Sequence, residues 1–283
     1  MRSNSINVQQ LQKTLQAKLV EARDELPAHT SLLLLQHVLN LPKSYLLAHG
    51  EYQPSPEEIV TLQNCLDQYL QGFPLPYILG HWEFFGRDFK VAPGVLIPRP
   101  ETELLVEKAL AFARQIKHPQ IVDVGTGSGV IAISLAAELP DAALIATDIS
   151  KAALAIAQEN ARQHLIQPIP FILTDLILPF RTHFDLICAN LPYIPSSTLD
   201  TLPVSRWEPR LALDGGQDGL QIIRQLLAQA QTRLSASGKI LLEIESSLGE
   251  ETLRCARQAF PTAACTLIQD LAGKDRIVDI QLP

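Results

Sequence analysis

Cysteine is scarce in this chain, and long apolar runs are missing from it. The four cysteines lie far apart in the sequence with no paired spacing, which favours small core residues over a disulfide framework or metal ligands. No run approaches the roughly 18 consecutive apolar residues of a membrane-spanning helix, and the N-terminus lacks the apolar stretch of a signal peptide. We therefore expect a cytoplasmic protein with no membrane partner and no bound metal.

Net positive charge is absent as well. The formal net charge is −7, so the chain has no overall excess of basic residues with which to bind the phosphate backbone of a nucleic acid. A local basic patch is still compatible with an acidic total. We therefore expect no direct nucleic-acid binding. A length of 283 residues with 47% hydrophobic side chains is enough for roughly two domains with a sizeable core.

The first part of the chain has a helical pattern. Up to about Gln71, apolar residues recur three or four positions apart, Pro56 is suited to open a helix, and no strand is evident. The segments from Tyr77 to Val91 are short, aromatic and interrupted by glycine, which indicates a β-hairpin that connects two domains. We expect a helical domain over residues 1–73, a hairpin linker over 74–93 and an α/β domain over 94–283.

From Gln120 onward, strand and helix patterns alternate. The strand candidates are Ile121–Val124, Leu144–Thr147, Phe171–Leu173, Phe184–Ala189, Ile240–Ile244, Cys265–Ile268 and Ile277–Leu282. Helical periods begin between them at Ser128, Lys151, Gln217 and Leu248, so the pattern predicts a largely parallel sheet with helices on both faces. Asp270–Lys274 is too short for a helical crossover, so one of the last two strands should run antiparallel.

A glycine-rich turn follows the first of these strands. Gly125 permits a sharp exit from the strand, Gly127 lets a ligand approach the backbone, and Gly129 allows close packing of the next helix. A dinucleotide-binding turn needs its third glycine one position later, where this chain has Val130. The spacing therefore favours a nucleotide-type cofactor over a bound pyrophosphate, and a purely structural turn is the alternative.

Acidic residues end the strands around this turn. Asp148 closes the next strand at the position where a carboxylate accepts ribose hydroxyls, or else it simply caps the helix from Lys151. Asp123 suits the ammonium of a methionine tail, or else it stabilises the turn as a strand-end residue. Asp175 and Leu176 end the third strand near the expected adenine, with an ordinary strand-to-loop cap as the alternative.

The tetrapeptide Asn190-Leu191-Pro192-Tyr193 follows an apolar strand. The Asn190 carboxamide and the Leu191 carbonyl offer two acceptors to a substrate NH2 group, Pro192 keeps Leu191 extended, and Tyr193 offers a ring face. Such a site holds a planar nitrogen in line with an electrophilic methyl group. The two motifs together predict a methyltransferase acting on that nitrogen; a proline-terminated strand that merely enters a loop is the alternative.

The sequence resembles the release factor glutamine N5-methyltransferases, the PrmC/HemK family. The resemblance covers nearly the whole chain and is carried by Pro74–Gly80, Glu83–Gly86, Val95–Glu103, the glycine turn, Asn190–Tyr193, Glu208–Leu220 and Asp270–Gly273 with Arg276. Its most specific block is Ile97–Glu103. Three positions depart from the family pattern: Leu191 replaces a proline, Leu176 replaces a common aromatic residue, and Leu242–Leu248 lacks the usual glycine and glutamine.

The resemblance implies a Rossmann-like class I S-adenosylmethionine-dependent methyltransferase domain, with a mixed seven-stranded sheet, beside a small helical N-terminal domain. It implies methyl transfer to the glutamine of the Gly-Gly-Gln loop in peptide chain release factors, with the helical domain helping to dock the release factor, and we expect a monomer. The implied cofactor site comprises Gly125, Thr126, Gly127, Ser128, Gly129, Asp148, Asp175, Leu176 and Asn190. Asn190, Leu191, Pro192 and Tyr193 are the implied substrate site, with Asn190 and Tyr193 catalytic.

Other features leave alternatives open. Pro98–Glu103 suits the start of a helix running to Ala113. The resemblance also implies that this loop, with Arg99, lies over the cofactor or the substrate entrance. His81 and Trp82 are interpreted as hairpin packing and not as a catalytic pair. A nucleic-acid adenine methyltransferase would use the same tetrapeptide on a flipped base. A nicotinamide-dependent oxidoreductase and a non-catalytic adaptor are the remaining alternatives.

Overall fold

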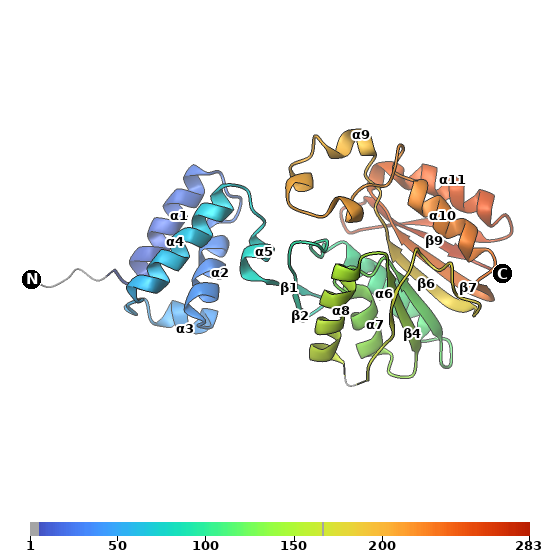
Figure 1. Ribbon diagram of the computed structural model, residues 1–283, viewed down its shortest axis with the longest axis horizontal. Helices are drawn as coiled ribbons and strands as arrows, with labels where there is room; N and C mark the ends of the chain where they lie inside the picture. Colours follow the sequence, from blue (N-terminus) through green and yellow to red (C-terminus); the bar gives the residue numbers. More distant parts are fainter. Residues whose placement is uncertain (1–5, 166) are drawn as a thin grey trace, which may run out of the picture. The chain divides into compact units, whose positions relative to one another are not determined.

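The computed structural model describes residues 6–165 and 167–283. The chain forms two compact units, the first ending at Gly80 and the second beginning at His81 (Figure 1). Within the described residues, no helix combines the length and the apolar character needed to cross a lipid bilayer.

The first unit contains helices and no strand within residues 6–80. They are α1 (Val8–Glu21), α2 (Pro27–Leu39), α3 (Lys43–Ala48), α4 (Pro56–Leu70) and α5 (Leu75–Leu79). The helical pattern predicted up to about Gln71 is confirmed: in α1, Val8, Leu11, Leu15 and Leu19 are buried in a core with leucines of α2 and α4. Asn7 and Ser55 cap the starts of α1 and α4 through reciprocal capping boxes.

The predicted hairpin is shorter than expected. Tyr77 to Gly80 was assigned to it, but these residues form and end helix α5, because Pro76 suits a first helical turn and Gly80 ends the helix with a φ of +78°. The hairpin itself comprises β1 (His81–Phe84) and β2 (Arg87–Lys90), which pair antiparallel. His81 Nδ1 lies 2.6 Å from Asp88 Oδ1 across the hairpin.

The hairpin belongs to the core of the second unit. Phe84 and Phe89 are fully buried and contact each other edge-on, with ring centroids 6.2 Å apart. Phe85 and Gly86 form the connecting turn, and both have positive φ angles. The turn is fastened to the following helix, because the Phe85 amide donates to Glu103 Oε1 at 2.8 Å.

The centre of the second unit is a seven-stranded sheet in the order β5-β4-β3-β6-β7-β9-β8. Its strands are β3 (Gln120–Val124), β4 (Ala143–Asp148), β5 (Phe171–Leu173), β6 (Phe184–Asn190), β7 (Leu234–Glu243), β8 (Ala264–Gln269) and β9 (Asp275–Gln281). All pairs are parallel except those of β9, which runs antiparallel to both β7 and β8. The predicted mixed sheet with one reversed strand near the C-terminus is confirmed.

Helices cover both faces of this sheet, as predicted (Figure 1). The larger helices are α6 (Thr102–Ala113), α7 (Val130–Glu138), α8 (Lys151–His164), α10 (Gln221–Ala230) and α11 (Gly249–Ala259); the short ones are α9 (Ser196–Leu199) and the 3-10 turns η1 (Pro203–Arg206), η2 (Arg210–Ala212) and η3 (Ser246–Leu248). Along β6, Leu186 and Cys188 join the core under α6, α7 and α8, whereas Ile187 and Ala189 join the core under α10 and α11. The prediction of core cysteines is confirmed for Cys188, Cys255 and Cys265, which are buried, whereas Cys65 is only partly buried against the core of the first unit.

Among the element boundaries, the starts of β7 and α10 differ most from the prediction. Strand β7 begins at Leu234, ahead of the predicted Ile240, because Leu234 already pairs with Phe184 before an irregularity in the ladder. Helix α10 begins at Gln221 and not at Gln217, because Gly219 has a φ of +78° and Asp218 accepts a hydrogen bond from the Leu220 amide.

Strand order creates a crevice at one edge of the sheet. From β3 the chain moves outward to β4 and β5, and it then returns to the other side of β3 with β6 and β7. Ligands of open α/β sheets bind where the order reverses, beyond the carboxyl ends of the strands. The glycine turn after β3 and the tetrapeptide after β6 therefore meet at this point.

Candidate active site

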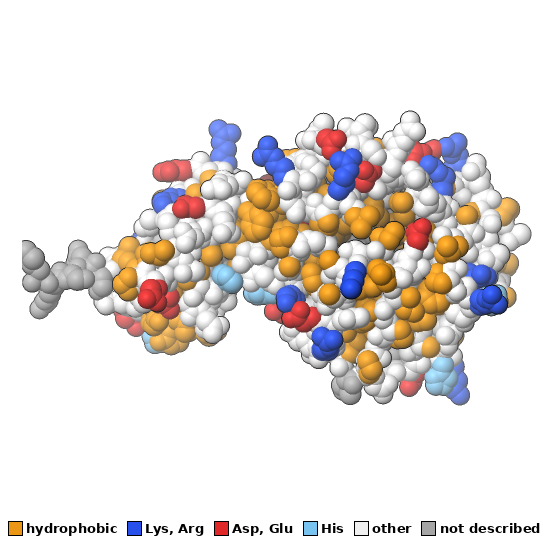
Figure 2. Space-filling model, viewed as in Figure 1, with side chains coloured by type: hydrophobic (Ala, Val, Ile, Leu, Met, Phe, Trp, Pro, Cys, Tyr) orange, Lys and Arg blue, Asp and Glu red, His pale blue; other side chains and the backbone are white. Residues whose placement is uncertain are grey.

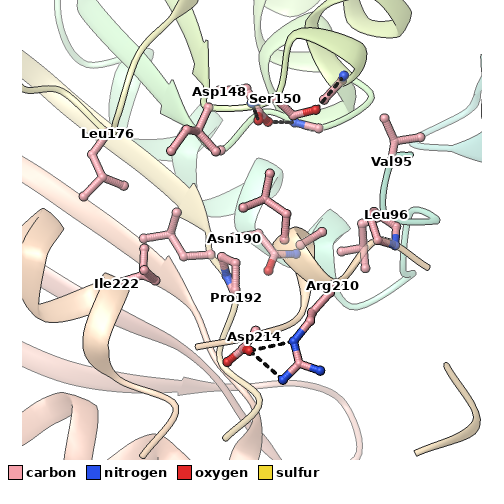
Figure 3. A pocket seen from close by; sticks show the side chains of 18 of the residues that line it. Val95, Leu96, Asp148, Ser150, Leu176, Asn190, Pro192, Arg210, Asp214 and Ile222 are labelled. Carbon is pink, nitrogen blue, oxygen red and sulfur yellow. Dashed lines mark hydrogen bonds and ion pairs between the residues drawn. The ribbon is translucent and has the colours of Figure 1, made fainter. Parts of the chain in front are cut away.

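A cavity of about 620 Å³ opens at this edge of the second unit (Figure 3). Of the predicted site residues it is lined by Gly125, Gly127, Asp148, Asp175, Leu176, Asn190, Leu191 and Pro192. Its size is typical of small-molecule and cofactor sites. The exposed side chains of Ile149 and Leu211 also line it, and Figure 2 shows hydrophobic side chains gathered on this unit between scattered charges.

The three glycines of the turn differ in what surrounds them. All have positive φ angles, 73° at Gly125, 57° at Gly127 and 87° at Gly129. A Cβ at Gly129 would lie 2.9 Å from Ile133 Cδ1, and one at Gly125 would lie 3.1 Å from Leu191 Cδ2. A Cβ at Gly127 would meet nothing within 4 Å, and Gly127 lines the cavity. The backbone at Gly127 is therefore the part of the turn most open to a ligand.

Asp148 is anchored at the cavity wall. Its Oδ2 accepts from the Gly127 amide and its Oδ1 from the Ser150 amide, each at 2.8 Å. Burial raises the pKa of Asp148, and these backbone hydrogen bonds oppose the rise. The side chain that caps α8 is that of Ser150, whose hydroxyl accepts from the Ala153 amide, so Asp148 is not needed for this cap. Each carboxylate oxygen can accept more than one hydrogen bond, so Asp148 can still accept from a ligand in the cavity.

Three residues of the turn, Thr126, Ser128 and Gly129, lie outside the cavity lining. Thr126 and Ser128 are buried, and the Thr126 hydroxyl donates to Asp123 Oδ2 at 2.6 Å. Asp123 also accepts from the Ala132 amide at 3.2 Å, and its side chain has no exposed surface. Burial raises the pKa of Asp123 to about 7. This buried position favours a role for Asp123 in stabilising the turn over contact with the ammonium of a methionine tail.

Leu176 is placed at the cavity by a strained backbone. It lines the cavity, its side chain is mostly buried, and its φ is +53°, a conformation that costs free energy for a branched residue. Asp175 lines the same wall. Leu173, which ends β5, is exposed but does not line the cavity.

The Asn190 carboxamide is held from one side. Its Nδ2 donates to Glu243 Oε1 at 2.8 Å and to Thr102 Oγ1 at 3.2 Å. An ionised carboxylate only accepts hydrogen bonds, so Glu243 sets the orientation of the amide. No hydrogen bond from the described residues reaches Asn190 Oδ1, which leaves this oxygen as an acceptor for a ligand in the cavity (Figure 3).

The rest of the tetrapeptide is divided between cavity and interior. Leu191 is buried against Gly125 and lines the cavity together with Pro192. Tyr193 is not part of the cavity lining. Burial and the nearby Glu243 raise the pKa of Tyr193 to about 12, so its hydroxyl stays protonated at neutral pH and does not act as a base.

The loop before α6 forms another wall. Val95 and Leu96 line the cavity, whereas Arg99 forms an ion pair with Glu208, a buried residue that also accepts from the Ile97 amide at 3.0 Å. These contacts join the loop to the segment that carries η2. Helix α6 begins at Thr102 and ends at Ala113, as predicted.

Sequence reasoning missed several parts of the site. The additional lining residues include Gly94, Thr147, Ser150, Ala153, Thr174, Ser196, Arg210, Ala212, Asp214 and Ile222. Glu243 and Thr102 were missed as partners of Asn190. A carboxylate at the end of the apolar run Ile240–Ile244 was a usable signal, because such a buried charge requires a partner.

Comparison with known proteins places the chain among methyltransferases. The PrmC N-terminal domain family matches residues 10–80, and the methyltransferase small domain family matches residues 100–202. A release factor glutamine methyltransferase of Moorella thermoacetica is 42% identical over 255 residues, which cover 89% of this chain and 90% of that protein. One of Koribacter versatilis is 37% identical over 256 residues, with 89% and 90% covered.

A solved structure supports the fold. A T. thermophilus 16S rRNA N2 G1207 methyltransferase in complex with AdoMet and guanosine superposes with a TM-score of 0.53 at 16% identity, covering 72% of this chain and 50% of that one. The sheet order and the cavity at its switch point define a class I methyltransferase fold. With relatives of this identity and coverage, the chain belongs to the release factor glutamine methyltransferase family.

Proposed function

We propose that this protein transfers the methyl group of S-adenosylmethionine to the side-chain nitrogen N5 of the glutamine in the Gly-Gly-Gln loop of peptide chain release factors. The observation that carries the proposal is the Asn190 carboxamide, whose Nδ2 is bound to Glu243 and Thr102 while the residue lines the cavity. Its Oδ1 is thereby presented to an NH2 donor such as a glutamine side chain.

The residues around the cavity fit the cofactor. Gly127 offers open backbone, Asp148 offers a carboxylate for two ribose hydroxyls, and Leu176 offers an apolar surface for the adenine. Gly125, Asp175 and Asn190 complete the proposed cofactor site along the same wall. Thr126, Ser128 and Gly129 contribute by shaping the turn, because their side chains or Cβ positions face the protein interior.

The chain's own residues align the substrate. The bound cofactor supplies an electrophilic methyl group on a positively charged sulfur. Asn190 Oδ1 and the Leu191 carbonyl accept the two hydrogens of the glutamine amide, which fixes the plane of a nitrogen whose lone pair is delocalised. With the cofactor bound, methylation would leave this nitrogen cationic and therefore acidic, so its proton could be lost without a strong base among the chain's own residues. Apolar Leu191 and Leu96 keep bulk water from the reacting atoms.

The helical first unit docks the release factor outside its Gly-Gly-Gln loop, and the enzyme works as a monomer in the cytoplasm. The docking role of the first unit is supported by the match of residues 10–80 to the PrmC N-terminal domain family. An acidic protein, with a formal net charge of −7, suits a protein substrate better than a nucleic acid.

Labelled methyl donor and purified release factors test the function directly. We expect the label on wild-type release factor and none on a release factor whose loop glutamine is replaced, with mass spectrometry locating the added methyl group. Bare duplex DNA serves as the competing substrate. Label on duplex and none on release factor would replace the proposal by a nucleic-acid adenine methyltransferase.

A further inference from the structure

Glu243 is a buried acidic group beside the proposed substrate site. It is the last residue of β7 and the register partner of Asn190 at the end of β6. Only 4% of the residue is exposed, and Oε1 accepts from Asn190 Nδ2 at 2.8 Å. Oε2 has no hydrogen-bond partner among the described residues. A carboxylate in such a place costs free energy, which calls for a reason for its presence.

The protonation state of Glu243 decides which way the Asn190 amide turns. When ionised, Glu243 offers only acceptors, so Nδ2 must face it and Oδ1 faces the cavity. When protonated, Glu243 has a hydroxyl that can donate to Oδ1, so the opposite orientation becomes available. Thr102 assists the first arrangement, because its hydroxyl oxygen accepts from Asn190 Nδ2 at 3.2 Å.

Charges from several elements act on this group. Burial, together with the nearby charge of Glu101 just before α6, raises the pKa of Glu243 to about 7. Thr102, Arg276 of β9 and Asn190 oppose this rise. Tyr193 packs against the same region with its hydroxyl kept neutral, and Arg276 is itself paired with Asp270 at 2.8 Å. Glu243 therefore changes its charge near neutral pH.

We propose that Glu243 is a positioning residue for methyl transfer: it acts through Asn190, holding Nδ2 so that Oδ1 is presented to the substrate amide, with Thr102 completing the clamp. This inference rests on the proposed function for its substrate, but the orientation of Asn190 does not depend on which substrate is used. Glu243 makes no contact with the cavity and therefore is not itself the base of the reaction.

The Glu243→Gln variant tests the kinetic part. It keeps the shape of the side chain but lets position 243 donate to Oδ1, so we expect kcat to fall about 10- to 100-fold, the range usual for loss of an orienting partner, with KM changed less than about threefold. The wild-type kcat should rise with pH through about 7, since Glu243 must be ionised, and this acid limb should vanish in the variant. Glu245→Gln, two residues away on an exposed side chain, is the matched control and should leave kcat and its pH profile unchanged.

Nitrogen-15 NMR of the wild-type protein tests the orientation without any variant or cofactor. We expect the Asn190 side-chain NH2 signals to shift between pH 5.5 and 8.5 with a midpoint near 7. Signals that do not titrate, or a Glu243→Gln variant with wild-type kcat and pH profile, would overturn the inference. A wild-type enzyme inactive on release factor would instead refute the proposed function, and the NMR titration would still decide the role of Glu243.

Discussion

Asn190 is the residue on which the proposed chemistry depends most. Its side chain lines the cavity and is hydrogen-bonded to both Glu243 and Thr102. It is therefore expected to matter for transfer more than for cofactor binding, because a single hydrogen bond contributes little to affinity.

Asn190→Ala should abolish methyl transfer while cofactor affinity stays within about tenfold, the effect of losing one ordinary hydrogen bond. Calorimetric titration of the methyl donor and a labelled-methyl assay measure the two quantities. Asn64→Ala, on the exposed side of α4, is the control and should behave as wild type. Retained transfer in Asn190→Ala would refute the assigned role.

Gly127 and Gly129 form a matched pair for separating ligand access from packing. Gly127→Ala places a methyl group in open space beside the cavity, so we expect cofactor affinity to fall at least about tenfold, with about 1 kcal/mol lost from the free energy of unfolding through backbone strain. Gly129→Ala meets Ile133 and the Ala157 Cβ, so unfolding should become easier by about 3 kcal/mol. Titration of the methyl donor and urea denaturation measure both. A larger loss of stability in Gly127→Ala than in Gly129→Ala, or a larger loss of cofactor affinity in Gly129→Ala, would contradict these roles of the two glycines.

At the scale of elements, α8 ties the hairpin to the glycine turn. Asn160 of α8 is fully buried; its Oδ1 accepts from the Lys90 amide at 2.8 Å, and its Nδ2 donates to the carbonyls of Lys90 and Ser128. The strand end of β2 and the start of α7 are thus held by one side chain. The sequence motif of the turn contains no hint of this contact, because the three segments are far apart in the chain.

Asn160→Ala should lower the free energy of unfolding by about 3 kcal/mol, since the backbone groups at Lys90 and the buried carbonyl of Ser128 lose their partner. Urea denaturation measures the change. Glu159→Ala removes the neighbouring exposed ion pair to Lys90 and should cost less than about 1 kcal/mol. Equal effects of the two substitutions would show that the buried contact adds nothing.

Most helices and strands were predictable from the local sequence pattern, and the helix that was missed is too short to show such a pattern. The strands from β3 to β9 were found because their apolar runs are bounded by turn residues, and the reversed β9 followed from a connection too short for a crossover. Helix α5 was missed because five residues rich in apolar side chains carry too little periodicity to distinguish a helix from a strand.

At the scale of the whole molecule, each of the two units has its own apolar core. The core of residues 8–78 is made of side chains from the helical unit alone, whereas the sheet cores begin with Phe84 of the hairpin. Such separate cores allow separate folding. Removing the first unit therefore tests whether it docks the release factor while the second unit carries out the methyl transfer.

A fragment of residues 81–283 should fold cooperatively and bind the methyl donor with near wild-type affinity, yet methylate release factor at least about tenfold less efficiently, because docking contributes to orientation. Thermal denaturation, donor titration and kcat/KM measure these properties. A short Gly-Gly-Gln peptide is the control substrate and should be methylated equally by fragment and full chain. An undiminished kcat/KM on release factor would remove the docking role from the helical unit.

The sequence by itself determined the alternation of strands and helices, the glycine turn and the tetrapeptide, because each depends on periodicity or on residues adjacent in the chain. Only the tertiary structure decided that Thr126 and Ser128 turn inward, that Glu208 holds the loop at Arg99, and that Glu243 and Thr102 clamp Asn190. These contacts join residues more than 50 positions apart or depend on which face of a turn a side chain occupies. Strand register and burial set them, and neither is encoded in any single local stretch.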